Sequence, residues 1–325
     1  MSEARNIAPA FGKTRLQVEA AVTIDAYQVF QGPNGEACVY DNATAASATS
    51  YIEPTTRGRF NVVKTASVVF LKGCRVYWDH SANACTFRKV NDRDFYTGRA
   101  AEDATSASTF AAIDLNADPP YDLDLLRDPY TTVAVGTQAL GGFLPPARAG
   151  GALHFLLSAT NEAQKVDALS VDGFAEEANA IIEFAFRVIS DGAGTVVDVS
   201  MGIANATHAT DADAITESVF IHLDANNTNI NAESDDGTTE VAATDTTKDY
   251  SEGAAVANRV LIWLDMRDPA DVQIYVDAVN VLPASVFDVD AGTGPWKLLV
   301  HVEKSAATDA YELAIDWMRA WFAEQ

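Results

Sequence analysis

Short apolar segments that alternate with polar residues run along most of this chain of 325 residues. In one of them Val272, Ile274 and Val276 share a face, as a half-buried β-strand requires. Similar segments recur at spacings of roughly 8–15 residues, and long helical patterns do not. We therefore expect an all-β chain whose main body is an antiparallel β-sandwich. The one helix that we expect is short and lies around Asp211–Glu217.

The expected strands fall into two groups. In the first group, Gly-Pro-Asn-Gly at 32–35 predicts a hairpin, because Asn-Gly accepts the positive φ of a tight turn. This group covers 26–30, 37–40, 60–64, 75–78 and 110–115. The second group covers 154–157, 166–171, 181–188, 196–201, 219–223, 239–243, 260–264, 272–276, 298–302 and 313–317.

A stretch rich in proline and glycine separates the two groups. Five of the 11 prolines lie between Pro119 and Pro146, with four glycines in or beside the same stretch. This density interrupts both helix and strand. We therefore expect a domain with an N-terminal arm at 1–116, a connector at 117–150 and a larger domain at 151–325. Within the connector, Tyr130–Val135 is expected to form a strand against a neighbour.

The acidic charge is confined to the second part. Residues 1–116 carry 12 basic and 12 acidic residues, whereas residues 117–325 carry 10 basic and 34 acidic residues, the whole net charge of −24. A neutral domain can approach another protein surface without repulsion. A strongly acidic one repels nucleic acid, other acidic polymers and its own copies. The sequence thus predicts an anchor followed by a solvent-facing body.

Composition excludes several other classes of protein. The hydrophobic fraction of 48 % indicates globular domains rather than a disordered acidic tail. The first 20 residues lack the build of a signal peptide, and no apolar run has the ~18 residues of a membrane span. We expect synthesis in a cytoplasm. Cys38, Cys74 and Cys85 are expected to be buried, reduced thiols.

The first domain resembles a known family. GRFNVVKTAS at 58–67, KGCRVYWDHSANACTF at 72–87 and FYTGRAAEDATSASTFAAIDL at 95–115 are similar in order and spacing to phage head-decoration (capsid cement) proteins. The chain differs from them at Val68–Leu71, where the family usually has small or polar residues. The resemblance covers about residues 15–116. It implies a small β-barrel that binds the major capsid protein, and a homotrimer at local threefold sites of the shell.

The second domain resembles the concanavalin A-like jelly roll of lectins and glucanases. The resemblance rests on the closing segment YELAIDWMRAWFA at 311–323. Glucanases of this fold use Glu-x-Asp-x-x-Glu on one strand. Here only Glu183 and the pair Asp265 and Asp268 come near such a pattern, so we expect no catalytic residues and no enzyme.

Metal sites are not expected either, and no cofactor is predicted. The segment 222–237 could offer Ca²⁺ oxygen ligands, but the EF-hand glycine and glutamate are out of register, and Asn and Asp favour turns. The histidines are too dispersed for a zinc motif. No P-loop, dinucleotide-binding or Gly-x-Ser-x-Gly motif occurs. The residues considered are Asp224, Asn226, Asn229, Asn231, Asp235, Asp236, His80, His154, His208, His222 and His301.

These observations predict a structural virion protein. The first domain would bind and stabilise the assembled head, and the acidic jelly roll would project from the outer capsid surface. The basic residues expected to contact the capsid are Arg57, Arg59, Lys64, Lys72 and Arg75. The alternative is an adhesin that binds host glycans through aromatic residues of the second domain, although core packing is the commoner role of such residues. These are Tyr250, Trp263, Tyr275, Trp296, Trp317 and Trp321. No glycan site can be assigned from the sequence, and neither nucleic acid nor membrane is an expected partner.

Overall fold

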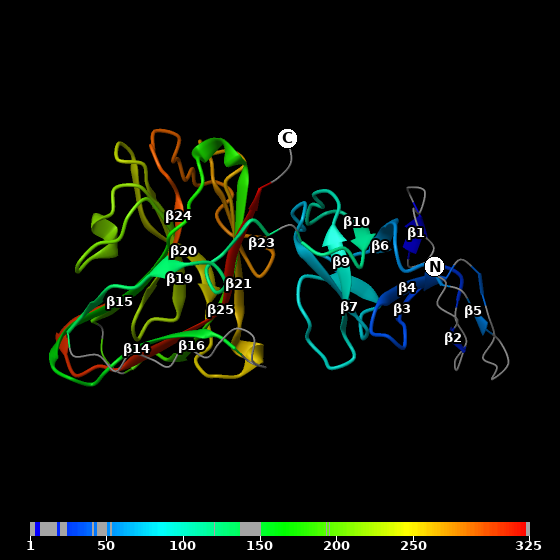
Figure 1. The fold of residues 1–325 in the computed structure, drawn as a ribbon, viewed down its shortest axis with the longest axis horizontal. Coiled ribbons are helices and arrows are strands. Elements are labelled where there is room, and N and C mark those ends of the chain that lie inside the picture. Colours follow the sequence, from blue (N-terminus) through cyan, green and yellow to red (C-terminus); the bar gives the residue numbers. More distant parts are fainter. Residues whose placement is uncertain are drawn as a thin grey trace. The chain divides into compact units, whose positions relative to one another are not determined.

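The computed structural model divides into two compact units, Met1–Pro120 (unit 1) and Tyr121–Gln325 (unit 2). It describes residues 4–6, 18–19, 25–40, 42–43, 51–52, 54–119, 121–136, 151–192, 194 and 196–322. Both units are built of antiparallel strands (Figure 1). In the described residues the helices are short 3₁₀ turns, and none is long and apolar enough to cross a membrane.

Unit 1 is built around one antiparallel sheet of six strands. Their order across the sheet is β1 (Ala4–Asn6), β6 (Arg59–Val63), β10 (Phe110–Leu115), β9 (Phe95–Ala100), β7 (Arg75–Asp79) and β8 (Ala84–Thr86). Two small two-stranded sheets accompany it: β2 (Val18–Glu19) pairs with β5 (Tyr51–Ile52), and β3 (Gln28–Gln31) forms a hairpin with β4 (Ala37–Tyr40). The β3–β4 turn confirms the predicted hairpin, and Gly35 has a φ of 86°.

The sheet of unit 1 curls but stays open among the described residues. A single parallel bridge joins Lys64, just after β6, to Cys85 of β8. One bridge does not make a continuous ladder, so this is a curled sheet rather than the closed barrel that the family resemblance implies. Phe60, Val76 and Trp78 point to its buried side. Their neighbours on the same strands, such as Arg59 and Arg75, therefore lie on the opposite face.

Unit 2 is a sandwich of two antiparallel sheets, as predicted. The seven-stranded sheet has the order β11 (Leu123–Asp124), β25 (Tyr311–Phe322), β16 (Ala180–Ser190), β21 (Val260–Asp265), β22 (Gln273–Val276) and β23 (Val279–Asn280), with β14 (Leu153–Leu157) also on β25. The eight-stranded sheet has the order β12 (Tyr130–Thr131), β15 (Glu162–Ser170), β24 (Lys297–Ala307), β17 (Val197–Ala204), β18 (Ser218–Asp224), β19 (Asn229–Asp235) and β20 (Glu240–Asp249), with β13 (Ala134–Val135) also on β15. The 3₁₀ turns are η1 (Glu176–Ala178), η2 (Ala212–Ala214) and η3 (Val256–Asn258).

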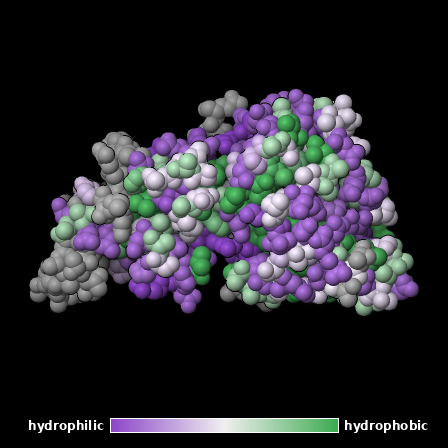
Figure 2. All heavy atoms as spheres, turned by 180° about the vertical axis from the view of Figure 1, so that it is seen from behind, coloured by the Kyte–Doolittle hydropathy of each residue, from purple (hydrophilic) through white to green (hydrophobic). Residues whose placement is uncertain are grey.

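One apolar core fills the space between these two sheets. It contains Phe184 and Ile262 from the seven-stranded sheet and Val199, Ile221 and Val300 from the eight-stranded sheet, all fully buried. Each such side chain contributes roughly 1.5–3 kcal/mol by leaving water. Figure 2 shows hydrophilic residues over much of the visible face of this unit, which carries the acidic charge.

The sequence places most strands within a few residues of their observed positions, and β4 and β10 match in full. The predicted helix at 211–217 is only the 3₁₀ turn η2. The expected connector contributes β11, β12 and β13 to unit 2, while its residues 137–150 lie outside the described residues. All three cysteines are buried thiols, and burial raises the pKa of Cys85 to about 12.

Candidate functional site

Four charged residues form a row across the exposed face of the unit 1 sheet. Arg59 of β6 pairs with Asp114 of β10, Asp114 pairs with Arg99 of β9, and Arg99 pairs with Arg75 of β7. Residues paired across neighbouring strands project from the same face. We call Arg59, Asp114, Arg99 and Arg75 the arginine row. The row brings together two of the predicted capsid-contacting residues and adds Arg99.

Asp114 organises the row by binding the arginines on either side. Arg59 donates two hydrogen bonds to its carboxylate, from Nε to Oδ1 at 2.8 Å and from Nη2 to Oδ2 at 3.1 Å. The Nε atom of Arg99 lies 3.7 Å from Oδ2. The hydrogen bond to Asp114 raises the pKa of Arg59. The row contains three guanidinium groups and one carboxylate, so it keeps a net positive charge, and the contacts to Asp114 hold the side chains of Arg59 and Arg99 in place.

The row continues into a pair of tyrosines. The guanidinium carbon of Arg75 lies 5.7 Å from the centre of the Tyr96 ring, and Tyr77 and Tyr96 pack edge to face with ring centres 5.7 Å apart. The Tyr96 hydroxyl donates to the carbonyl oxygen of Ala117 at 2.5 Å, and burial raises its pKa. Arginine and tyrosine on a rigid sheet have the composition of interface hot spots.

Arg57 and Lys72 lie outside the row. Arg57 is exposed, and its Nη1 donates to the carbonyl oxygen of Asn116 at 2.6 Å. Asn116 in turn binds the main chain of Ala37 and Thr56, which joins the β3–β4 hairpin to the end of β10. Lys72 is half-buried, in the turn before β7. Both can add contacts around the row, but neither extends it.

Lys64 is buried, with 5 % of its surface exposed. Its ammonium group donates to the carbonyl oxygens of Val68 at 2.5 Å and Thr65 at 3.2 Å, and burial lowers its pKa. This side chain therefore holds the turn that leads into Val68–Leu71. The burial argues against a direct contact between Lys64 and the capsid, and we leave it out of the proposed surface below.

The carboxylates considered for catalysis have structural partners in unit 2. Glu183 is buried, and it accepts hydrogen bonds from Trp263 Nε1 at 3.0 Å and from the Tyr121 hydroxyl at 3.2 Å. Its cross-strand neighbours are Trp263 and Arg319. Asp265 binds Arg267 at 2.6 Å. These contacts position the strands and turns around them.

We expect no hydrolysis of glucans, xylans or peptidoglycan by the purified chain. A retaining glycosidase needs two carboxyl groups about 5 Å apart, whereas Glu183 is flanked by an indole and a guanidinium group. The measurement is reducing-sugar release by the wild-type chain and by the Glu183→Gln variant. Release that this substitution abolishes would contradict the prediction.

The aromatic residues considered for glycan binding lie mainly in the interior. Tyr250, Trp263, Tyr275, Trp296 and Trp321 are buried. The indole of Trp317 is half-buried and covered by the guanidinium groups of Arg259 and Arg319, whose central carbons lie 4.7 and 5.2 Å from its ring centre. The five buried rings cannot stack on a sugar, so glycan binding through them is not supported.

The segment considered for Ca²⁺ forms a hairpin instead of an ion-binding loop. Residues 229–235 are strand β19, which the sequence reasoning missed. Asp235 Oδ1 accepts from the amide of Gly237, and Asp236 Oδ1 accepts from those of Thr238 and Thr239. Both carboxylates thus stabilise the β19–β20 turn, the role that Asp commonly has in turns.

Comparisons with known proteins support the resemblance of unit 1. Residues 13–115 match the family described as phage cement protein. They lie within unit 1 and include the arginine row. A search of curated proteins gave no match.

Solved structures similar to the chain share little sequence with it. The carbohydrate recognition domain of Emp47p is 13 % identical over 62 % of this chain and 94 % of that one, with a TM-score of 0.41. A structure from a study of endo-acting O-glycanases of the human gut microbiota is 11 % identical over 63 % of this chain and 100 % of that one, with a TM-score of 0.42. A GH16 protein of Bacteroides ovatus is 10 % identical over 59 % and 94 %, with a TM-score of 0.39. At these values the likeness carries no conclusion about activity or ligand.

Proposed function

We propose that this chain is a phage capsid decoration protein, in which unit 1 binds the assembled shell and unit 2 projects from its outer surface. The match of residues 13–115 to the phage cement family carries this proposal. The neutral charge of residues 1–116 and the arginine row, in which Arg59 is exposed and Arg75 and Arg99 are half-buried, support unit 1 as the attachment unit. The partner is the major capsid protein. The homotrimer expected from the sequence stays a prediction.

Decoration stabilises a shell through mass action. A protein that binds the assembled shell, and not its separated subunits, stabilises the shell by about 2.7 kcal/mol per site at a free concentration 100 times the Kd. Many occupied sites multiply this small contribution. The acidic body of unit 2 keeps neighbouring particles apart by charge repulsion.

The proposed contact surface consists of Arg59, Arg75 and Arg99, with Tyr77 and Tyr96 beside them and Arg57 and Lys72 around them. On this surface Arg59 and Arg99 already share the carboxylate of Asp114. Recognition would therefore depend on short-range hydrogen bonds from the planar guanidinium groups and on packing against the tyrosine rings. Long-range electrostatic attraction would contribute less.

Mixing the purified chain with undecorated capsids tests the proposal. We expect the chain to co-sediment with shells at a saturable stoichiometry, and electron microscopy to show added density on the outer surface. An absence of binding to shells of the cognate phage at saturating concentration would refute the proposed function.

We expect salt to leave decoration unchanged or to strengthen it. The acidic bodies repel one another on a crowded shell, and salt screens that repulsion over a Debye length of about 8 Å at physiological ionic strength. Occupancy measured from low to high salt checks this. A steep loss of occupancy at high salt would instead assign the attachment energy to ion pairs from the arginine row to an acidic capsid surface.

A further inference from the structure

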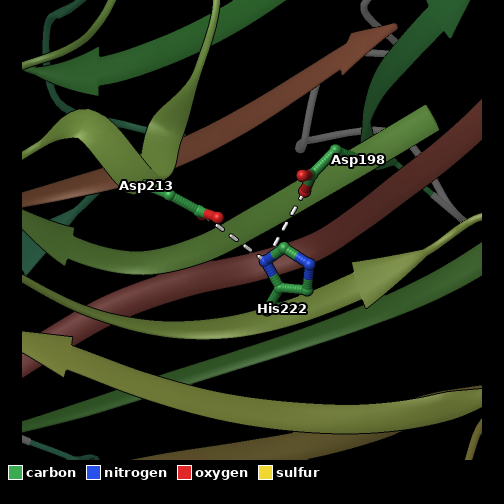
Figure 3. Close-up of side chains that lie close together, drawn as sticks. All are labelled: Asp198, Asp213 and His222. Carbon is green, nitrogen blue, oxygen red and sulfur yellow. Dashed lines mark ion pairs between the residues drawn. The ribbon is translucent and has the colours of Figure 1, made fainter. Parts of the chain in front are cut away.

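One buried histidine of unit 2 faces three carboxylates from three different elements. His222 of β18 lies on the face of the eight-stranded sheet opposite the core. Its Nδ1 atom is 3.5 Å from Asp198 Oδ1 of β17, 3.6 Å from Glu233 Oε1 of β19 and 3.8 Å from Asp213 Oδ1 of η2. Figure 3 shows the carboxylates of Asp198 and Asp213 directed at the same ring nitrogen. We call these four residues the His222 cluster.

The other ring nitrogen has a partner of its own. Nε2 of His222 lies 3.3 Å from Asp224 Oδ1, within hydrogen-bond distance. Within the described part of the chain, His222 Nδ1, Asp198 Oδ1 and Glu233 Oε1 are buried and have no hydrogen-bond partner. His222 is 5 % exposed. If the Nε2 proton is donated to Asp224, Nδ1 directs its lone pair at the carboxylate oxygens.

The cluster sets three carboxylates around one imidazole. One proton on Nδ1 could bond only one of the oxygens, and all three are beyond the 2.7–3.2 Å of a good N–H···O bond.

The spacing of these atoms suits ligands around a metal ion. Zinc bonds to nitrogen and oxygen of about 2.0–2.2 Å place neighbouring ligands of a tetrahedron about 3.3–3.6 Å apart. The three distances from Nδ1 fall at or just above this range. A metal-binding histidine commonly donates its other ring N–H to a carboxylate, as Nε2 can do to Asp224.

We infer that the His222 cluster binds a divalent transition-metal ion, with Nδ1 of His222 and the carboxylates of Asp198 and Asp213 as ligands and Glu233 beside them. An imidazole nitrogen favours zinc and its neighbours in the first row over Ca²⁺ and Mg²⁺, which prefer ligand sets made only of oxygen. The ion would bring its own positive charge to a cluster of three carboxylates.

Local packing holds the ligands in position, and an adjoining cavity gives an ion access to them. Ala212 and Ile215, on either side of Asp213, belong to a small apolar cluster with Phe220 and Leu299 on the outer side of the sheet. A cavity of about 290 Å³ adjoins the site, and its lining includes Asp213, His222, Glu233 and Glu240. A bound ion would tie the η2 segment to β17, β18 and β19, so its expected role is structural.

Titration calorimetry on the tag-free full chain, freed of metal by a chelator, tests the inference. We expect one Zn²⁺ per chain, bound at least tenfold more tightly than Ca²⁺. Asp213→Asn should weaken Zn²⁺ binding at least tenfold. Because the Asp213 side chain is 53 % exposed, this variant should fold. Glu240→Gln removes an equal charge from the lining of the same cavity and should change the Kd less than twofold.

Proteolysis gives a second measurement on the same proteins. Zn²⁺ should slow thermolysin cleavage within residues 205–217 of the wild-type chain and of Glu240→Gln, and not of Asp213→Asn. Equal weakening by both substitutions would show diffuse attraction of cations to acidic side chains and would overturn the inference. An absence of saturable Zn²⁺ binding by the wild-type chain would also overturn it. Neither result depends on capsid binding.

Discussion

Residues 1–120 alone should bind undecorated capsids, and residues 121–325 alone should not. The family match lies within the first range, and each range is a compact unit. The first unit also presents the arginine row, whereas the second is strongly acidic. Co-sedimentation of each folded fragment with shells provides the measurement. Binding by the second fragment and not by the first would reverse the assignment of anchor and body.

At residue level, we expect the double substitution Arg59→Glu and Arg75→Glu in the full chain to abolish decoration. It places two negative charges on a row that already contains Asp114, and it removes the guanidinium group that packs on Tyr96. Removing an arginine from the centre of an interface commonly costs about 2 kcal/mol or more. Arg267→Glu in unit 2, which breaks a pair with Asp265, is the matched control and should bind normally. Equal binding by all three proteins would exclude the row as the contact surface.

The strands of this protein were predictable because their signal is local. Alternation of apolar and polar residues located β22 and β24, and Gly-Pro-Asn-Gly located the β3–β4 turn. Strand β19 gave no such signal, since Asn229–Asp235 offers only Ile230 and Ala232 to the core. Its pairing with β18 and β20 makes it a strand, and the sequence of the segment alone does not predict that pairing.

The candidate sites were less predictable, because strand register assembles them. Arg99 lies in the segment 95–115 that resembles the cement family. Only its pairing with Asp114 and Arg75 shows that it lies in the same row as Arg59. A lysine side chain is usually exposed, but the turn that follows Lys64 buries this one.

The same limit applies to the histidines of unit 2. The spacing of the histidines in the sequence argues against a zinc motif. The cluster at His222 instead takes its carboxylates from two adjoining strands and a 3₁₀ turn, at positions 198, 213 and 233. Conventional metal motifs depend on short separations along the chain, so they do not detect such an arrangement.

Asp316→Ala should cause the largest loss of stability, and the loss should fall on unit 2. Asp316 interrupts the apolar closing strand β25, and its side chain is 5 % exposed. It accepts hydrogen bonds from Arg187 Nη2 at 2.6 Å and Nε at 3.1 Å, and from Arg259 Nε at 2.6 Å. Removing the carboxylate leaves the buried Arg187 without its charged partner, which costs about 3–5 kcal/mol for a buried pair.

Calorimetry of the full chain measures this effect. For a unit of this size each kcal/mol shifts the Tm by about 2–4 °C, so the unit 2 transition should fall by roughly 10 °C. The unit 1 transition should not move, because each unit has its own core. Asp268→Ala removes an exposed carboxylate of the same unit and should change stability by no more than about 0.5 kcal/mol. A common shift of both transitions would mean that the two units unfold as one. Unit 1 could then not be treated as an attachment unit that folds independently of unit 2.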